Sequence, residues 1–360
     1  MMTVAIVGAG IAGRLLAWRL AKLGYRVELF DKNKRDDECA CSFAAAGILS
    51  PLAELEMAEP DIYQYGSRSM KLYQEWLPQL TQDVFFKVTG SLVTAHGSDK
   101  IELDHFYRQV QRKTRELKIV EAELKSETIE KVSVETIEPE LAHLGQGLYI
   151  PSEGQIDPIE LLKALAFEID NSVNVNWHNQ AEVSNVSAHK LKCGSESLTF
   201  DWVFDCRGLG AKGDLPLRAV RGELLWLESK DVNIKHLTRL IHPRYRIYVV
   251  PRPNDIYLVG ATEIQSEDFS PVSVRSSLEL LSAAYSVHRG FGEARIVKSV
   301  VNCRPALTDN LPLIDTTFGL TRVNGLYRHG ILMSPAVIEK AIREFKHISN
   351  HDLEKVQHAN

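Results

Sequence analysis

The chain has 360 residues, of which 25% are charged and 44% hydrophobic, and its formal net charge is −5. This length allows about two domains, each with its own core, and the composition is ordinary for a globular protein. The acidic balance argues against nucleic acid as the main partner. No apolar run approaches the roughly 18 residues of a membrane span, and the N-terminus lacks the basic region of a signal peptide. We therefore expect a cytoplasmic protein.

The cysteines and histidines give no sign of a metal site. The five cysteines match no zinc-binding spacing, and the twelve histidines form no HExxH pattern. We expect reduced, packed cysteines and no metal.

The first 32 residues have the pattern of a βαβ unit. The stretch TVAIVGAGIAG (3–13) is a short apolar strand that runs into glycines. A helical stretch follows, with Leu16, Leu20 and Leu23 on one face, and RVELFDK (26–32) is a second strand. Strand, glycine turn, helix and strand within about 30 residues indicate a Rossmann-like α/β domain.

The glycines of this turn are spaced as in dinucleotide-binding folds. Gly8 permits the tight turn, Gly10 lets the backbone approach a pyrophosphate, and Gly13 lets the helix pack on the strand. The helix that begins near Ile11 then directs its free N–H groups at the phosphates. Asp31, at the end of the second strand, can accept the ribose hydroxyls. A glycine turn without a ligand is the alternative, but strand, helix and Asp31 together favour dinucleotide binding.

The chain then leaves the repeated βα units of an NAD domain. In CACSFAAAGILSP (39–51), small residues either let the backbone pass close to a flat group or simply begin a helix tightly. Residues 51–80 are predicted to be helical. VFFKVTGSLVTA (84–95) predicts two strands, and residues 101–125 predict a charged, solvated helix.

The second half of the chain alternates between strands and turns. Residues 173–186 and 197–206 have strand-like alternation, and Gly208 follows in a turn that is either a second contact to the cofactor or an ordinary loop. RYRIYVVPRPNDIYLVGATE (244–263) predicts a hairpin that turns at Pro253 to Asp255. A helix is expected within 270–287.

Arg304 stands between two apolar stretches of SVVNCRPALTDNLPLID (299–315). A buried cation without a partner is costly, so Arg304 either forms a salt bridge to Asp309 or Asp315 or binds a substrate carboxylate bidentately. Tyr248, in an alternating strand, is either a second donor to that carboxylate or a core tyrosine.

The stretch LYRHGILMSPAVIEK (326–340) predicts a glycine turn that opens a C-terminal helix. Free N–H groups in this turn can stabilise negative charge on a reduced cofactor, although a plain turn would have the same sequence.

In this order, these segments resemble the D-amino-acid oxidase superfamily of FAD enzymes, and most of all its bacterial glycine oxidases of the thiamine thiazole pathway. The resemblance covers nearly the whole chain and rests on AIVGAGIAG, SFAAAGILSP, YVVPRPNDIYLVGATE, CRPALTDNLPLI and LYRHGILMSPA. The first of these is shared by many flavin families, whereas the last three together are more selective.

The resemblance implies non-covalently bound FAD and an α+β architecture, in which an antiparallel-sheet substrate domain is inserted into a Rossmann-like FAD domain. The FAD domain would comprise residues 1–79, 140–218 and 305–346, the substrate domain residues 80–139 and 219–304, and a C-terminal tail residues 347–360.

The resemblance also implies which residues hold the cofactor. The adenosine and pyrophosphate would contact Gly8, Gly10, Ile11, Ala12, Gly13, Asp31 and Lys32, with Val183 on the adenine and Gly208 in a further turn. The flavin end would be lined by Cys41, Ser42, Ala46, Gly47 and Ile48 and wrapped by Leu326, Tyr327, Arg328, His329, Gly330, Ile331 and Leu332.

For catalysis, the resemblance implies that Arg304 binds the substrate carboxylate with Tyr248 beside it and Arg328 near the same site. The implied reaction oxidises the CH–NH bond of glycine or a small D- or N-substituted amino acid to an imine. Hydride passes to the flavin, and reoxidation by molecular oxygen gives hydrogen peroxide. No side-chain base is required.

Three positions depart from the family pattern: Leu307 replaces a threonine, Asp315 a glycine, and Glu263 an apolar pocket residue. Glu263 either attracts a second amine of the substrate or faces solvent. These changes affect the identity of the substrate more than the fold or the cofactor.

Other functions remain open at this stage. A flavin dehydrogenase that uses a quinone or another carrier would share every motif, and so would an enzyme that demodifies an aminomethyl-carboxylate on tRNA, although the acidic charge counts against it. A non-catalytic flavoprotein and an NAD-dependent dehydrogenase are further alternatives. The sequence leaves open whether the chain forms a homo-oligomer.

Overall fold

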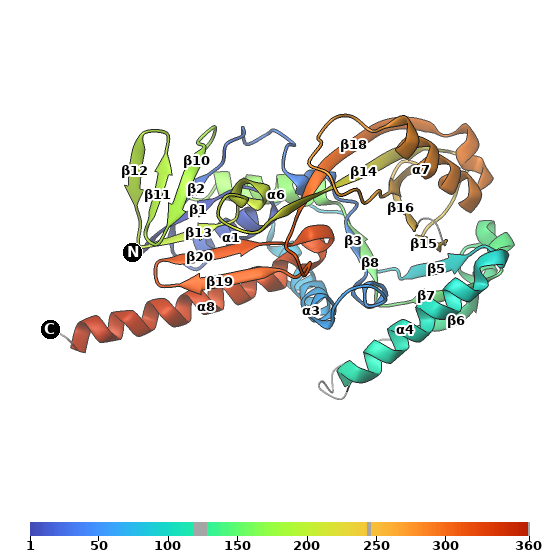
Figure 1. Cartoon of the computed structure of the whole chain (residues 1–360), viewed down its shortest axis with the longest axis horizontal. Helices are drawn as coiled ribbons and strands as arrows, with labels where there is room; N and C mark the ends of the chain where they lie inside the picture. Colours follow the sequence, from blue (N-terminus) through green and yellow to red (C-terminus); the bar gives the residue numbers. More distant parts are fainter. Residues whose placement is uncertain (119–127, 243–245, 359–360) are drawn as a thin grey trace.

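Two large β-sheets lie side by side along the long axis of the molecule, with helices packed against them (Figure 1). The computed structural model describes residues 1–118, 128–242 and 246–358. Within these ranges, no helix is long and apolar enough to cross a bilayer.

The first sheet has six strands in the order β19-β20-β13-β1-β2-β9. All neighbouring strands are parallel except β19 and β20. The strands are β1 (Thr3–Val7), β2 (Arg26–Phe30), β9 (Val175–His178), β13 (Trp202–Asp205), β19 (Leu313–Thr317) and β20 (Leu320–Asn324). Both faces of the central strand β1 are covered, as its continuous apolar run predicts.

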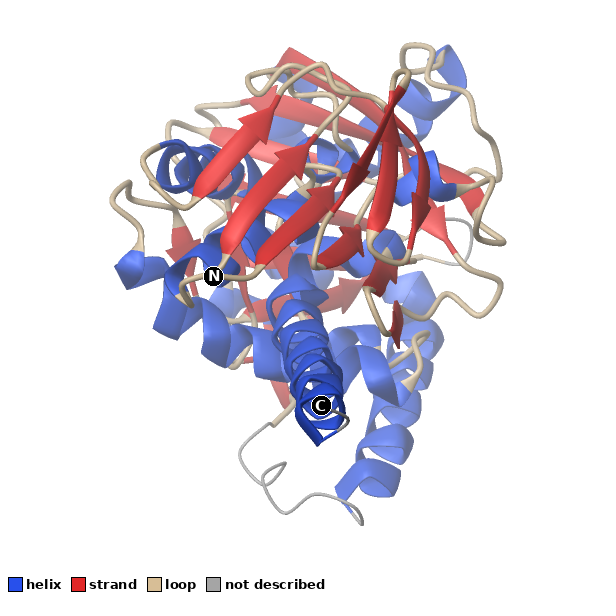
Figure 2. Ribbon diagram, turned by 90° about the vertical axis from the view of Figure 1, so that its left-hand side faces the viewer, coloured by secondary structure: helices blue, strands red, loops and turns tan. Residues whose placement is uncertain are grey.

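Helices cover one face of this sheet. Val4 and Ile6 of β1 share a core with apolar residues of the helices α1 (Ile11–Lys22), α3 (Pro60–Trp76), α6 (Pro158–Asp170) and α8 (Gly330–His358). Ala5 and Val7 point to the other face, where they pack against a small sheet of β10 (Val183–Ser187), β11 (Lys190–Cys193) and β12 (Glu196–Thr199). Figure 2 views the molecule from the left-hand side of Figure 1, with the C-terminal end of α8 toward the reader.

The second sheet has eight strands in the order β18-β14-β17-β16-β15-β5-β7-β6, and all pairs are antiparallel except β15 and β5. The strands are β5 (Ser91–Ala95), β6 (Glu130–Ser133), β7 (Gln146–Ile150), β14 (Arg218–Glu228), β15 (Leu237–Ile241), β16 (Ile247–Arg252), β17 (Ile256–Gly260) and β18 (Arg295–Ala306). The helices α5 (Val134–Ile137) and α7 (Val274–Val287) pack on one face. The helices α2 (Pro51–Glu54) and α4 (Lys100–Lys118) share a further core with β5 and β7.

Short elements connect the two sheets. A third sheet, in the order β3-β8-β4, consists of β3 (Ile48–Leu49), β8 (Gly154–Ile156) and β4 (Phe86–Lys87). Single 3₁₀ turns are η1 (Cys41–Ala44), η2 (Leu77–Gln79), η3 (Gly97–Asp99), η5 (Pro139–Leu144), η6 (Gly208–Ala211), η7 (Arg289–Glu293) and η8 (Tyr327–His329).

The fold class and the main elements are confirmed. The predicted hairpin is β16 and β17, and its turn places Asn254 and Asp255 at φ of 63° and 58°, which these two residue types tolerate. The expected tail from residue 347 is helical up to His358, because that stretch contains no glycine or proline and α8 continues through it. Residues 119–125 of the predicted charged helix, residues 244–245 of the hairpin stretch and residues 359–360 lie outside the described residues.

The division into two domains stays a proposal, with one change. We expected residues 140–218 in the FAD domain, but β7 pairs with β5 and β6. Residues 146–150 therefore belong with the second sheet.

Candidate active site

A cavity of about 1140 Å³ lies between the two large sheets. Its wall comes from the glycine turn after β1, the stretch 39–48, one face of the second sheet, the segment after β17 and the loop before α8. Small-molecule pockets usually hold about 300–1,000 Å³, so this cavity has room for a dinucleotide and a small second ligand.

The predicted site residues meet in this one cavity, except for Gly13. The lining residues among them are Gly8, Gly10, Ile11, Ala12, Asp31, Lys32, Cys41, Ser42, Ala46, Gly47, Ile48, Val183, Gly208, Tyr248, Glu263, Arg304, Leu326, Tyr327, Arg328, His329, Gly330, Ile331 and Leu332. In the described part of the chain, no group of three or more His, Cys, Asp or Glu side chains is placed to hold a metal ion.

The glycine turn after β1 forms one end of the cavity. Gly8 has a φ of 98°, which is readily adopted only by glycine. A Cβ on Gly13 would lie 1.8 Å from the Gly8 carbonyl oxygen, so only glycine lets α1 pack this closely on the turn. Asp31 accepts hydrogen bonds from the N–H groups of Ala9 (2.6 Å) and Asn33 (2.8 Å), which fix its carboxylate at the cavity edge.

The start of α1 is suited to an anion. Gly10, its N-cap residue, has no side chain to cap the helix, and the first turn contains no acidic residue. A Cβ on Gly10 would meet only the Ser42 Oγ, at 3.6 Å, so the space beside it is open. Ser42, which we predicted at the flavin end, accepts the Ile11 N–H at 3.1 Å. The free N–H groups and the helix dipole therefore fit the pyrophosphate of FAD.

Arg304 extends over the face of the second sheet. It pairs with Val220 of β14, so strand alternation puts its side chain on the same face as Gly222. A Cβ on Gly222 would lie 2.2 Å from the Arg304 Nη2, so the missing side chain makes room for the guanidinium. Its Nη1 donates to the Thr262 carbonyl oxygen at 3.3 Å.

Within the described ranges, no carboxylate forms an ion pair with Arg304, so the internal salt bridge is not formed. Asp315 pairs with Arg322 at 3.1 Å instead, and Asp309 accepts the Leu311 N–H at 3.0 Å. The Arg304 guanidinium is therefore available to a ligand.

Tyr248 lies beside Arg304 on the same sheet face. It pairs with Arg239 of β15 on one side and with Gly260 of β17 on the other. A Cβ on Gly260 would lie 2.8 Å from the Tyr248 Oη, so this second glycine makes room for the hydroxyl. Burial raises the pKa of Tyr248, so the hydroxyl remains a hydrogen-bond donor at neutral pH.

Glu54, the last residue of α2, is a member of the site that the sequence analysis missed. Its side chain is 11% exposed and pairs with Arg239 at 2.7 Å, Arg328 at 3.4 Å and His329 at 3.1 Å. Burial alone would raise the pKa of Glu54, but the Arg239 and Arg328 guanidiniums outweigh it and lower that pKa. Burial also lowers the pKa of His329 to about 4, so the imidazole is neutral. In the sequence, nothing distinguishes Glu54 from the nearby Glu56 and Glu59.

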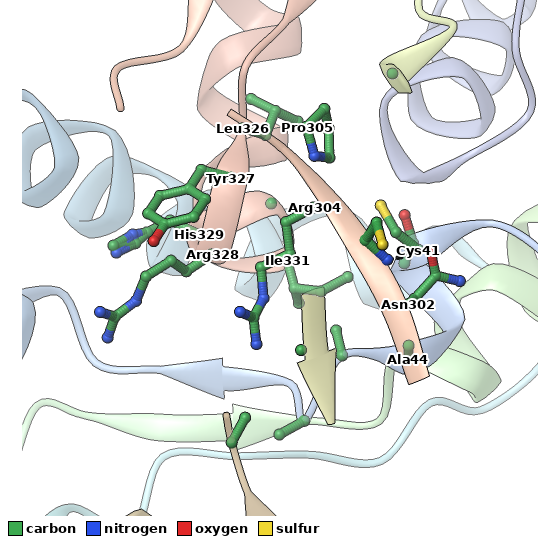
Figure 3. Close-up of a pocket in the computed structure, with 18 of the residues that line it drawn as sticks. Cys41, Ala44, Asn302, Arg304, Pro305, Leu326, Tyr327, Arg328, His329 and Ile331 are labelled. Atoms are coloured by element: carbon green, nitrogen blue, oxygen red, sulfur yellow. Dashed lines mark hydrogen bonds between the residues drawn. The ribbon is translucent and has the colours of Figure 1, made fainter. Parts of the chain in front are cut away.

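In the group formed by Arg304 and the ion-paired residues around Glu54 and Glu263, guanidinium groups outnumber carboxylates by one. Glu54 and Glu263 are carboxylates, whereas Arg239, Arg304 and Arg328 are guanidinium groups. Figure 3 shows the side chains of Arg304 and Arg328 extending in the same direction from neighbouring segments. The substrate end therefore suits a ligand with one negative charge.

Comparison with known families identifies the chain. The family model of FAD-dependent oxidoreductases matches residues 3–341. The chain belongs to this family. It is therefore an FAD-binding enzyme, and the resemblance inferred from the sequence is confirmed.

Relatives of this FAD-dependent oxidoreductase cover almost its whole length. A Rhizobium etli protein, assigned by name as the thiamine biosynthesis oxidoreductase ThiO, is 35% identical over 344 residues, which are 95% of this chain and 96% of the relative. The glycine oxidase of Geobacillus kaustophilus is 28% identical over 351 residues, covering 92% and 89% of the two chains. The crystal structure of glycine oxidase from that organism superposes with a TM-score of 0.79 at 26% identity, covering 94% of this chain and 93% of the other.

Proposed function

We propose that the chain oxidises the CH–NH bond of glycine, or of a small D- or N-substituted amino acid, to an imine. The observation that carries this proposal is the Arg304 guanidinium, which lines the cavity without a carboxylate partner among the described residues. The glycine oxidase of Geobacillus kaustophilus, a relative over almost the whole chain, supports the same substrate class.

The nucleotide end of the cavity offers groups suited to each polar part of FAD. Gly10 and the N-terminus of α1 would hold the pyrophosphate, and Asp31 would accept the ribose hydroxyls. Residues 326–332 would wrap the flavin. When bound, FAD supplies the acceptor for the hydride of the substrate α-carbon, and its reoxidation by oxygen yields hydrogen peroxide.

At the substrate end, Arg304 binds the carboxylate through its two terminal nitrogens, and the Tyr248 hydroxyl donates a further hydrogen bond. These contacts fix the orientation of the α-carbon within the cavity. Neither His329 nor Glu54 acts as a general base, because the two pair with each other and Glu54 is also held by Arg239 and Arg328. The substrate therefore reacts with its amine already neutral, and water hydrolyses the released imine to a 2-oxo acid and ammonia, or the corresponding amine where the substrate is N-substituted.

The proposal is tested by adding glycine, sarcosine and a panel of small D-amino acids to the purified yellow protein without oxygen. We expect at least one of them to bleach the flavin absorbance. A yellow protein that no member of the panel bleaches would overturn the proposed substrate class.

Admission of air then separates an oxidase from a dehydrogenase. An oxidase regains its colour within a few turnovers and releases hydrogen peroxide, whereas a dehydrogenase stays bleached until an artificial quinone is added. We expect the first result.

A further inference from the structure

The segment that follows β17 places a carboxylate against the second arginine of the substrate end. Glu263 accepts a hydrogen bond from the Tyr327 hydroxyl at 2.5 Å, and its other oxygen pairs with Arg328 at 3.3 Å. The Glu263 side chain is 45% exposed, so it lies at the mouth of the cavity rather than in the core.

The arginines at this end are consequently not equivalent. Arg328 is paired with both Glu54 and Glu263, and Arg239 is paired with Glu54. In the part of the chain that the structure describes, the Arg304 side chain donates a hydrogen bond only to the Thr262 carbonyl oxygen. A ligand thus finds one guanidinium whose charge no neighbouring carboxylate has neutralised.

The position of Glu263 is fixed by a buried ion pair behind it. Arg221 (4% exposed) and Glu223 (0% exposed) pair at 2.6 Å on β14. Arg221 donates to the carbonyl oxygens of Asp268 (2.6 Å) and Pro271 (2.9 Å), and the Thr262 hydroxyl donates to Glu223 at 3.1 Å.

The backbone of the segment is attached to β14 as well. Arg221 and Ile264 exchange two backbone hydrogen bonds, of 2.8 Å and 3.0 Å. Glu263 lies between Thr262 and Ile264, so its backbone is anchored to β14 on both sides. This arrangement places it opposite Arg328 without requiring a ligand.

We propose that Glu263 restricts the substrate to amino acids with a single carboxylate. Arg304 binds that carboxylate, while Glu263 keeps Arg328 occupied and repels a second negative charge. This inference rests on the proposed function, because it concerns the selectivity of the same site. This role differs from the two considered in the sequence analysis, a partner for a second substrate amine and a carboxylate that faces solvent.

The test compares equilibrium binding of acetate and malonate to the FAD-loaded protein, followed by the change in flavin absorbance. Binding needs no turnover, so the result does not depend on the identity of the substrate. In the unmodified protein we expect acetate to bind more tightly than malonate. In Glu263→Gln the ratio of the two affinities should shift toward malonate by about tenfold, the size expected for removal of one nearby like charge.

Glu267→Gln is the matched control, since it removes the same charge from the same segment. Glu267 pairs with Lys212 and does not line the cavity. Its acetate-to-malonate ratio should stay unchanged. If Glu263→Gln leaves the ratio as it is, or if both variants shift it equally, the selectivity role is overturned while the proposed function stands. If the unmodified protein binds neither acetate nor malonate, both the anchor role of Arg304 and the selectivity role fail.

Discussion

The two ends of the cavity are built in different ways. The nucleotide end depends on backbone geometry within one short stretch, where Gly8 and Gly13 allow a turn and a close helix contact. The substrate end depends on side chains that come from α2, β15, β16, β18 and the segments after β17 and before α8. A site formed by backbone atoms tolerates few substitutions, whereas a site formed by side chains can change its ligand specificity through single replacements.

The largest effect is expected at the nucleotide end. In Gly13→Val, the new side chain meets the Gly8 carbonyl oxygen, because even a Cβ would lie 1.8 Å from it. We expect this variant to lose FAD and all flavin absorbance on purification. Gly24→Ala is the control, since Gly24 lies just after α1 and has open space around it, although its φ of 84° brings some strain. Retention of FAD by Gly13→Val would show that α1 and the turn can separate without loss of the site.

At the substrate end, we expect the largest effect on the free energy of unfolding from loss of the ion pairs of Glu54. Glu54→Gln leaves Arg239 with uncompensated charge in a largely buried place and leaves Arg328 with only its pair to the half-exposed Glu263. We expect the free energy of unfolding, measured with urea, to fall by about 3 kcal/mol, the lower end for a broken buried ion pair. FAD should still bind. The exposed Glu59→Gln should change stability by less than about 0.5 kcal/mol. Equal stability of the two variants would mean that Glu54 is not held as a buried ion.

A third carboxylate, that of Glu153, accepts a hydrogen bond from α2 and makes the stability of the fold depend on pH. It accepts the Ala53 N–H at 2.7 Å, and burial raises its pKa to about 7 from an ordinary value of 4.5. Between these two values the folded state binds more protons than the unfolded state, so Glu153 stabilises the protein at low pH and loses this contribution as pH rises from 4.5 to 7.

Glu153→Gln should remove this dependence. The unfolding free energy of the variant minus that of the unmodified protein should increase by roughly 3 kcal/mol from pH 4.5 to pH 7. This size follows because a shift of one pKa unit corresponds to about 1.4 kcal/mol. Urea unfolding of both proteins at the two pH values gives this difference. A difference that does not change with pH would mean that Glu153 is ionised throughout.

The sequence was sufficient to predict the geometry of the glycine turn after β1 and part of the arrangement around Arg304. Gly8, Gly13 and Asp31 lie within one βαβ unit, so their contacts are short-range and their spacing predicts them. The face that Arg304 and Tyr248 share follows from strand alternation once the strands are paired. It could not be predicted that Gly222 and Gly260 make room for these two side chains, because the pairing of β14, β17 and β18 is a long-range property.

The ion pairs of Glu54 show more clearly that long-range contacts cannot be predicted from local sequence. Glu54 contacts Arg239, Arg328 and His329, which lie 185 to 275 positions further along the chain. No local pattern distinguishes one carboxylate of a helix end from its neighbours, so Glu54 was missed and Arg328 was predicted without its partners. Glu263 was noticed only because it departs from the family pattern.

The most direct test is the anaerobic reduction of the flavin by glycine in the unmodified protein and in Arg304→Gln, followed by stopped-flow absorbance. We expect the observed rate in the unmodified protein to saturate with glycine concentration. In Arg304→Gln we expect bound FAD and an apparent second-order rate lower by about 10³-fold, since two charge-assisted hydrogen bonds are lost. Similar saturation and rate in both proteins would contradict the assignment of Arg304 as the carboxylate anchor, and with it the substrate site described above.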